Sequence, residues 1–186
     1  KNQAFMDADL KGKELVRWKY QRYVKDYLRC VAAVDDGIGR ILESLDKLGL
    51  SENSIVIYSS DQGFYLGEHG WYDKRWIYEE SLKMPLVMRW PGKIKAGTII
   101  KKLTQNIDFA PFFLEAAEAE VPEEIQGMSL MPLFKKPNAK WRNAIYYHYY
   151  EAGGHGVPAH YGIRDERYKL MHFPRTDEWN LVDLKE

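Results

Sequence analysis

The sequence predicts an α/β fold that ends in a small antiparallel β-sheet. Three observations support this fold class: helical periodicity at residues 14–48, short apolar runs at 55–60 and 86–90, and runs rich in aromatic and β-branched residues after residue 140. The chain has 186 residues, of which 45% are hydrophobic, so it can bury a substantial core.

The long periodic stretch predicts one helix with a single apolar face. Its apolar residues recur every three or four positions, at Tyr27, Val31, Val34, Ile38, Ile41, Leu45 and Leu48. This spacing is typical of a helix that buries one face. Gly37 and Gly39 each weaken a helix by about 1 kcal/mol relative to alanine, so we expect either a bend or a close backbone approach there. Gly49 is a natural end for the helix.

The two apolar runs predict β-strands. Residues 55–60 are typical of a buried strand, and α/β sheets bind ligands just beyond the carboxyl ends of their strands. Residues 86–90 predict a second strand, closed by the turn pair Pro91-Gly92. The loop between the strands is long and rich in polar, ionisable and glycine residues. We therefore expect a functional site in this loop.

The next part of the chain predicts one short extended segment and one helix. Residues 98–104 form the extended segment. Asp108 caps the helix, which has Pro111 at its second helical position and runs to about residue 119. Residues 121–138 have no strong periodicity and predict a connector.

The C-terminal region predicts an antiparallel sheet. Turn residues separate four runs with strand character, at 144–150, 159–164, 168–173 and, more weakly, 179–184. We therefore expect two domains, an α/β domain at residues 1–140 and a small C-terminal subdomain at 141–186.

The composition excludes several classes of protein. Lys and Arg total 27 and Asp and Glu total 27, so no basic excess favours nucleic acid. No run of about 18 apolar residues is present, so we expect no membrane span. Cys30 is the single cysteine, which excludes an internal disulfide and a four-thiolate zinc site. We expect Cys30 to be a thiol of the core.

Asp61 and Gln62 follow the first predicted strand and are candidate metal ligands. A carboxylate and a carboxamide offer hard oxygen atoms, which suit Ca²⁺ or Mg²⁺ better than zinc. Calcium usually takes about six to eight oxygen ligands, so other residues must complete such a site. The alternative is a turn that only caps the next segment.

Lys74 and His69 are candidates for acid and charge chemistry. Lys74 lies in the triplet Asp73-Lys74-Arg75 between aromatic residues, and its ammonium can neutralise charge on an ester or protonate a leaving group. The alternative is a solvated charged surface. His69, between two glycines, is either a general acid, a hydrogen-bonding support for another residue, or an exposed turn residue.

The segment at residues 147–161 concentrates three of the five histidines among aromatic residues and glycines. Such a segment is suited to hold a carbohydrate through aromatic faces and histidine hydrogen bonds. The alternative is a β-hairpin with aromatic cross-strand pairs.

At this point the residues resemble a known family, the type I, formylglycine-dependent sulfatases of the alkaline-phosphatase-like superfamily. The stretch SSDQGFYLGEHGWYDKRWIYEESLKMPLVMRWPG is similar to a signature region of that family. The resemblance extends over practically the whole chain and implies the C-terminal part of an alkaline-phosphatase-like α/β sandwich. The DKR triplet and the GGH and HYGIR segments look most like N-acetylglucosamine-6-sulfatases, which act on glycosaminoglycans or mucin-type glycans.

The resemblance implies a role for each candidate residue. Asp61 and Gln62 would be ligands of Ca²⁺, and Lys74 would contact the sulfate and the leaving oxygen. His69 follows the family's GEHG pattern as a second catalytic candidate. The residues expected to hold the sulfated sugar are Asp73, Arg75, His155 and His160. The resemblance also implies an extracytoplasmic parent protein, either periplasmic, secreted or lysosomal.

The sequence departs from the family in one respect that determines whether the isolated chain can be active. The nucleophile motif, Cys or Ser followed by x-Pro or Ala-x-Arg, is missing, and Cys30 is followed by VAAV without arginine in register. We therefore expect the chain to be the C-terminal portion of a sulfatase that is inactive alone. A truncated sheet has an open edge, so we also expect edge-mediated self-association.

Two other functions stay open. A phosphoesterase of the same superfamily shares the metal ligand at the strand end, although Gln62 argues against a dinuclear zinc site. The other alternative is a non-catalytic glycan-binding module.

Overall fold

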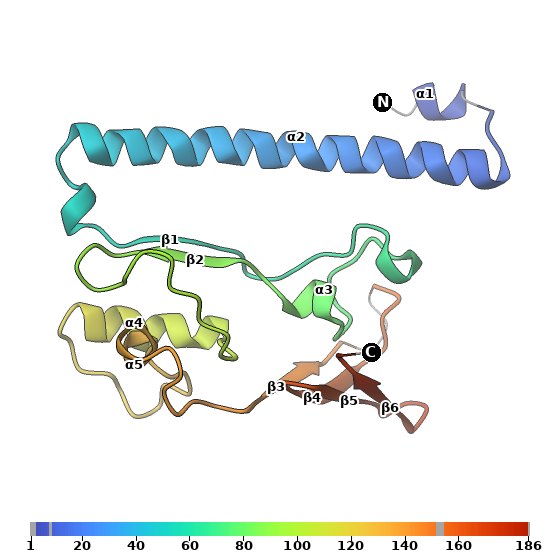
Figure 1. Cartoon of the computed structure of the whole chain (residues 1–186). Helices are drawn as coiled ribbons and strands as arrows, with labels where there is room; N and C mark the ends of the chain where they lie inside the picture. The colour runs from blue at the N-terminus through green and yellow to red at the C-terminus, as the bar shows by residue number, and fades with distance from the viewer. Residues whose placement is uncertain (1–2, 8, 152–154, 186) are drawn as a thin grey trace. The chain divides into compact units, whose positions relative to one another are not determined.

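The computed structural model describes residues 3–7, 9–151 and 155–185. The chain divides into two compact units, which are described separately. The first consists of the described residues up to Glu52 together with Leu66–Tyr72, and the second consists of Asn53–Tyr65 with the described residues from Asp73 onward. Figure 1 shows the order of the helices and strands along the chain.

The first unit is built on one long helix. A short helix α1 (Gln3–Met6) precedes α2 (Gly12–Lys47), which has 36 residues and confirms the predicted helix within two residues. Gly49 follows it in a left-handed conformation, φ 68°, as expected for a residue that ends a helix. A single turn, η2 (Glu68–Gly70), lies in the loop of this unit.

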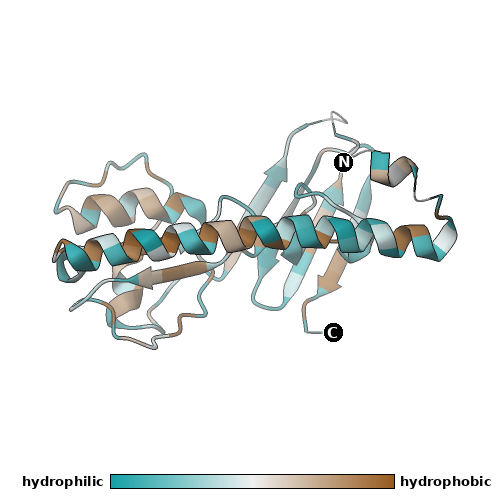
Figure 2. Cartoon of the chain, turned by 90° about the horizontal axis from the view of Figure 1, so that it is seen from above, coloured by the Kyte–Doolittle hydropathy of each residue, from teal (hydrophilic) through white to brown (hydrophobic). Residues whose placement is uncertain are grey.

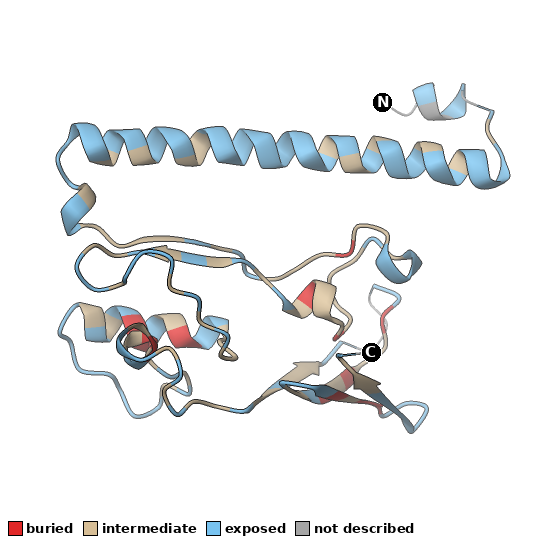
Figure 3. Ribbon diagram, in the orientation of Figure 1, coloured by how far each residue is buried: buried red, intermediate tan, exposed pale blue. Residues whose placement is uncertain are grey.

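The predicted burial of the apolar face of α2 is wrong. No residue of α2 is buried (Figure 3), and Val31, Val34 and Ile41 are exposed. The helix is amphipathic nevertheless, and Figure 2 shows hydrophobic and hydrophilic residues interspersed along it. Cys30 is also exposed and is not a core thiol. The reason is that this unit contains one long helix and a short loop, which cannot enclose a side chain.

The predictions for Gly37 and Gly39 are also wrong. The helix is continuous through both residues, and Figure 1 shows no bend in it. A Cβ atom at either position would have no heavy atom within 4 Å. Neither glycine is therefore needed for a close approach. The rest of the 36-residue helix tolerates their weak helix propensity.

The second unit begins with two paired strands. Strand β1 (Val56–Ser59) and strand β2 (Leu86–Arg89) confirm the two predicted strands within one residue at each end. They pair antiparallel, with Ser59 opposite Leu86. A four-residue helix α3 (Glu79–Leu82) lies in the loop that connects them. The sequence does not predict this helix, because four residues carry no periodicity.

Two helices pack against this strand pair. Helix α4 (Phe109–Ala116) and helix α5 (Met131–Lys135) contribute the buried residues Phe112 and Leu133 to one apolar cluster. Side chains of β1 and β2 pack against that cluster, among them Ile57 and Met88. Helix α5 lies inside the predicted connector, and its five residues are again too few for a periodic signal.

Asp108 does not cap α4 as predicted. Its side chain makes no capping hydrogen bond to that helix. Both oxygens of its carboxylate are instead bound by the guanidinium of Arg142, at 2.5 and 2.6 Å, and the backbone N–H of Gln105 and of Met128 also donate to it. Pro111 is the third helical residue rather than the second. The buried ion pair competes with the cap for the same carboxylate oxygens.

The four strands at the C-terminal end confirm the predicted antiparallel sheet. Its strands are β3 (Ala144–Tyr149), β4 (His160–Asp165), β5 (Tyr168–Phe173) and β6 (Glu178–Asp183). Neighbours in the chain are neighbours in the sheet, in the order β3-β4-β5-β6. One face carries Met171 and Phe173, which are buried with Ile77. The sheet is thereby fixed to the loop that precedes α3.

Two further features complete the fold. Residues 98–104 form no strand in the described structure, although the sequence predicts an extended segment there. None of the described helices is both long enough and apolar enough to cross a membrane. The predicted α/β fold class is confirmed, and the boundary after residue 140 stays a prediction.

Candidate functional site

Asp61 and Gln62 lie directly after the end of β1, and long-range contacts fix their backbone. The side-chain amide of Asn106 donates a hydrogen bond to the carbonyl oxygen of Asp61 at 2.7 Å. The hydroxyl of Ser60 lies 2.8 Å from the carbonyl oxygen of Gln62 and 3.3 Å from a carboxylate oxygen of Asp61. Asp61 itself is exposed. The carboxylate can therefore reach a ligand while its backbone is held.

Gly63 explains why the chain turns at this point. Its N–H donates to the carbonyl oxygen of Ser81 at 2.7 Å. A Cβ atom at residue 63 would lie 2.0 Å from the carbonyl oxygen of Glu80, which no real side chain allows. Only glycine permits this approach of two backbone segments. The backbone at Asp61 is thus held by Asn106, and the backbone just after Gln62 is held by the hydrogen bond from Gly63 to Ser81.

The oxygen atoms of Asp61 and Gln62 fit part of a calcium site. Both side chains offer hard oxygen donors, and two adjacent ligands are fewer than calcium requires. Within the described residues, no group of three or more His, Cys, Asp or Glu side chains is arranged to hold a metal. Asp61 and Gln62 by themselves are therefore an incomplete ligand set for calcium.

Lys74 lies in a loop whose backbone is ordered by a carboxylate. One carboxylate oxygen of Asp73 accepts hydrogen bonds from the backbone N–H of Lys74, at 2.6 Å, and of Arg75, at 2.7 Å. The ammonium of Lys74 makes no hydrogen bond or ion pair in the part of the chain that the structure describes. The backbone of Lys74 is thus fixed by hydrogen bonds, while its positively charged ammonium group has no hydrogen-bond or ion-pair partner among the described residues.

Asp73 and Arg75 are bound to each other. The guanidinium of Arg75 donates to the second carboxylate oxygen of Asp73 at 2.7 Å. Burial acts to raise the pKa of Asp73, but the hydrogen bonds from Lys74 and Arg75 and the charge of Arg75 bring it below its ordinary value. Asp73 is therefore ionised at neutral pH and orders the loop.

The candidate metal ligands and Lys74 are tied together through Ser81. The carbonyl oxygen of Ser81 accepts the N–H of Gly63, and its hydroxyl donates to the carbonyl oxygen of Lys74 at 2.5 Å. A second tie runs from the N–H of Tyr65 to the carbonyl oxygen of Asp73, at 2.8 Å. The structure thus brings the Asp61 segment and the Lys74 segment side by side.

His160 is completely buried in an aromatic environment. Rings of Trp76, Tyr147, Tyr149 and Phe173 lie between 5.5 and 5.7 Å from its ring, measured between centroids. Its Nδ1 lies 2.8 Å from the carbonyl oxygen of Pro158, and its Nε2 has no hydrogen-bond partner among the described residues. Burial lowers the pKa of His160, so the ring is neutral at pH 7. A neutral ring that donates from Nδ1 leaves Nε2 as an acceptor.

His155 and His69 are both exposed and belong to different units. His155 lies in the loop between β3 and β4, with its Nε2 3.8 Å from a carboxylate oxygen of Glu151. His69 belongs to the first unit, where it has a positive φ of 56° and its ring centroid lies 5.6 Å from that of Trp71. Positive φ is costly for a residue other than glycine, so the η2 turn holds His69 in a strained conformation.

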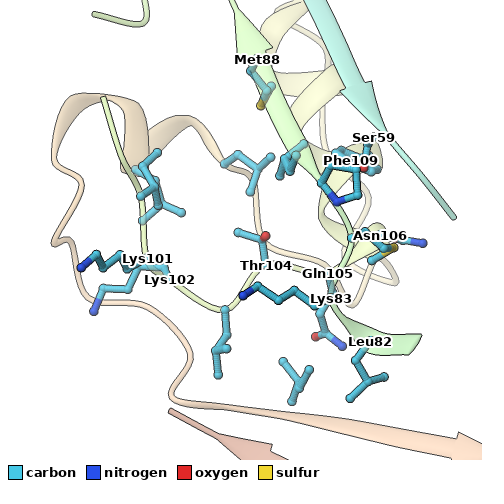
Figure 4. A pocket seen from close by; sticks show the side chains of 18 of the residues that line it. Ser59, Leu82, Lys83, Met88, Lys101, Lys102, Thr104, Gln105, Asn106 and Phe109 are labelled. Carbon is cyan, nitrogen blue, oxygen red and sulfur yellow. The ribbon is translucent and has the colours of Figure 1, made fainter. Parts of the chain in front are cut away.

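A cavity of about 410 Å³ lies among residues of the second unit. Apolar side chains such as Met88 and Phe109 line it, with Lys101, Lys102 and Lys83 nearby (Figure 4). Asn106, whose side chain binds the carbonyl oxygen of Asp61, belongs to its lining, whereas Asp61, Gln62 and Lys74 do not. The candidate site is therefore a set of ordered loops and not this cavity.

Several residues that support the site cannot be identified from the sequence. These are Asn106, which holds Asp61, Ser81, which links the two loops, and the tyrosines Tyr65 and Tyr147, whose hydroxyls bind the Lys74 loop. Their partners are between 7 and 72 residues away in the chain. No local motif could have indicated these contacts.

The chain is similar to several known proteins. A protein named N-acetylglucosamine-6-O-sulfatase from Bacteroides thetaiotaomicron is 53% identical over 97% of this chain and 33% of its own length. A solved protein in complex with its substrate D-glucosamine-2-N,6-O-disulfate matches with a TM-score of 0.93 and 52% identity, over 98% of this chain and 38% of that one. The chain thus spans about a third of the length of this relative and of an arylsulfatase from Clostridium perfringens, which is 28% identical over 86% of this chain.

A more distant solved structure shares the fold. The phosphonate monoester hydrolase from Silicibacter pomeroyi matches with a TM-score of 0.72 and 26% identity, over 82% of this chain and 33% of that one. The fold is thus the alkaline-phosphatase-like fold of these hydrolases.

Two family models cover the chain between them. The model described as Sulfatase matches residues 2–119, and the model described as N-sulphoglucosamine sulphohydrolase, C-terminal, matches residues 67–186. Each covers well over half of the sequence, and the chain therefore belongs to the sulfatase family.

Proposed function

We propose that this chain forms the charge-handling part of a sulfatase that removes the 6-O-sulfate from N-acetylglucosamine in glycosaminoglycan or mucin-type glycans. The observation that carries the proposal is Lys74, whose backbone is held on both sides while its ammonium has no partner in the described chain. A preorganised cation of this kind stabilises negative charge that develops on an ester. The name of the Bacteroides relative and the 6-O-sulfated substrate of the solved relative support the choice of sugar.

Asp61 and Gln62 are the residues of this chain that would hold a calcium ion. Their hard oxygen donors suit calcium, and further oxygen ligands are needed to complete its coordination. In a complete enzyme, the calcium ion would withdraw charge from the sulfate and a formylglycine would supply the nucleophile. The chain's own sequence contains no formylglycine motif. The 186-residue chain alone is therefore expected to release no sulfate.

Lys74 has two tasks in this proposal. Its ammonium donates hydrogen bonds to the sulfate oxygens and to the sugar oxygen that leaves, which lowers the charge on both as the S–O bond breaks. His69 is the second catalytic candidate, and its strained position in the η2 turn supports a functional role.

Four residues are proposed to hold the sugar. Arg75 uses one of its N–H groups on Asp73 and has further donors for sugar hydroxyls. His155 is exposed in the β3-β4 connection and is available to hydrogen-bond a sugar. His160, the first residue of β4, is completely buried, so its Nε2 acceptor can reach a sugar hydroxyl only if the aromatic side chains around it move apart. A glycan substrate agrees with an extracytoplasmic location, which we propose for the parent protein.

The test uses the whole enzyme that contains this chain, with N-acetylglucosamine-6-sulfate as substrate. Released sulfate is measured by ion chromatography for the wild type, Lys74→Met and Lys101→Met. Lys101 is a lysine of the cavity lining and serves as the matched control. We expect a loss of about 100-fold or more for Lys74→Met and no change for Lys101→Met. Full activity of Lys74→Met would refute the role of Lys74.

A phosphoesterase is the second candidate function, favoured by the similarity to the phosphonate monoester hydrolase. The same enzyme is therefore assayed with a phenyl phosphonate ester. Faster turnover of the phosphonate than of the sulfated sugar would favour this candidate. Binding of the sugar by calorimetry, without metal dependence and without turnover, would favour a glycan-binding module.

A further inference from the structure

Three consecutive carbonyl groups of the Lys74 loop each accept a hydrogen bond from a side-chain hydroxyl. The hydroxyls of Ser81, Tyr147 and Tyr65 donate to the carbonyl oxygens of Lys74, Arg75 and Trp76, in that order, at 2.5, 2.7 and 2.9 Å. We call these three donors the hydroxyl clamp. They come from three different parts of the second unit, namely α3, β3 and the segment that follows β1.

The loop has no secondary structure that could provide these hydrogen bonds. Residues 73–76 belong to no helix or strand. The N–H groups of Lys74 and Arg75 are bound by Asp73, and their carbonyl groups are bound by the hydroxyl clamp. Every polar backbone group of both residues is thus satisfied by a side chain. The position of the Lys74 backbone is determined by these contacts.

The donors are themselves held rigidly. Tyr65 is completely buried, and Ser81 is 5% exposed. Tyr147 lies on the face of β3 that packs against the Ile77 cluster. The pKa of Tyr147 is raised, first by burial and then by the neighbouring Tyr149 and Asp73, and burial also raises the pKa of Tyr65. Both phenols therefore remain protonated donors at neutral pH.

We propose that the hydroxyl clamp consists of positioning residues that aim the ammonium of Lys74 at the sulfate group. This inference rests on the proposed function, because it assigns the clamp a role through Lys74. A side chain with four rotatable bonds can be directed only if its backbone is fixed. A reacting group displaced by about 1 Å can lose about 100-fold in rate.

Tyr147→Phe is the first test, made in the whole enzyme. It removes one hydroxyl and keeps the ring that packs against His160. Tyr146→Phe is the matched control, because it removes a hydroxyl from the neighbouring residue of β3, whose side chain is exposed and lies on the other face. We expect Tyr147→Phe to lower kcat about tenfold with little change in KM, and Tyr146→Phe to change neither. An unchanged kcat in Tyr147→Phe would overturn the proposal.

A double-mutant cycle separates positioning from general stability. If Tyr147 acts through Lys74, the effect of Tyr147→Phe on kcat disappears in the Lys74→Met background. If the two losses multiply, the tyrosine acts independently of Lys74 and the proposal is wrong. If Lys74→Met alone keeps full activity, the proposed function fails instead. The two failures are therefore distinguishable.

Hydrogen exchange provides a readout without turnover. The backbone N–H groups of residues 74 and 75 should exchange faster in Tyr147→Phe than in the wild type or in Tyr146→Phe, as measured by mass spectrometry. Ser81→Ala removes the donor to Lys74 while its backbone still accepts the N–H of Gly63. Ser81→Ala should likewise lower kcat and speed the exchange at residues 74 and 75. It provides the test if Tyr147→Phe does not fold. Unchanged exchange in both variants would contradict the clamp.

Discussion

Lys169 and Glu79 form a nearly buried ion pair, with Nζ of Lys169 2.7 Å from a carboxylate oxygen of Glu79 and only 1% of the lysine side chain exposed. The guanidinium of Arg164 binds the same carboxylate at 3.0 Å. Glu79 begins α3, and the two cations belong to β5 and β4. The pair therefore joins the loop region of the site to the C-terminal sheet.

Acidification should weaken this junction. Burial acts to raise the pKa of Glu79, but hydrogen bonds and charge from Arg164 and Lys169 bring it below its ordinary value of 4.5. A carboxylate with a depressed folded pKa contributes stability above its unfolded pKa and loses it as the pH falls through the folded value. The free energy of unfolding, measured with urea, should therefore fall below about pH 4.5.

Glu79→Gln tests whether protonation of the Glu79 carboxylate causes this loss of stability. At pH 7 it should cost about 2 kcal/mol, because two cations lose their carboxylate and Glu79 is partly exposed. The variant should also show a shallower loss of stability below pH 4.5. Glu115→Gln, an exposed change in α4, is the control and should change neither quantity. Parallel pH curves for Glu79→Gln and the wild type would contradict this prediction.

Gly63→Ala should destabilise the protein by about 3 kcal/mol or more, because its Cβ would lie 2.0 Å from the carbonyl oxygen of Glu80. Gly37→Ala is the matched comparison, for which we expect a change in the free energy of unfolding of the opposite sign. Its Cβ meets open space inside α2, so helix propensity should stabilise the protein by about 0.5–1 kcal/mol. Thermal and urea unfolding measure both changes. Equal stability of Gly63→Ala and the wild type would exclude the close backbone approach.

Gln62→His should change the metal preference of the whole enzyme. The carboxamide oxygen is a hard donor suited to calcium, whereas imidazole nitrogen favours zinc. Calorimetry should show weaker binding of calcium and tighter binding of zinc in the variant. Asn138→His, a change in the connector after α5, serves as the control for a new surface histidine. Unaltered calcium affinity in Gln62→His would argue against Gln62 as a ligand.

The isolated chain should self-associate through a strand edge. The sheet of β1 and β2 has two strands and therefore two unpaired edges. Sedimentation velocity should show larger species as the protein concentration rises. Val87→Lys, which places a charge at an exposed position of β2, should reduce this association. A monomer at all concentrations in the wild type would show that the edges are protected.

The sequence allowed prediction of the elements whose signals are local. The four strands of the C-terminal sheet and the long helix α2 follow from periodicity and turn residues, and their ends differ by two residues or fewer. Helices α3 and α5 were missed because four or five residues contain about one turn. Burial of the α2 face was also wrongly predicted, since periodicity indicates an apolar face and not what covers it.

Only those candidate site residues that belong to a local sequence motif could be predicted. Asp61, Gln62 and Lys74 were identified by their place after a strand and by resemblance to a family, and their roles stay proposals. The partners that hold them, such as Asn106 and Tyr147, are set by tertiary contacts over 45 and 72 residues. Such contacts leave no trace in local sequence.

The hydrogen bond from Tyr147 to the carbonyl oxygen of Arg75 has a consequence for the order of events during synthesis. Its two residues are 72 positions apart, so the donor leaves the ribosome well after the acceptor. Until strand β3 has been made, the Lys74 loop lacks one of its three hydroxyl donors. The nascent chain therefore completes the hydroxyl clamp only after β3 has been synthesised, and a product stalled before β3 would carry the signature motif with two of its three hydroxyl donors.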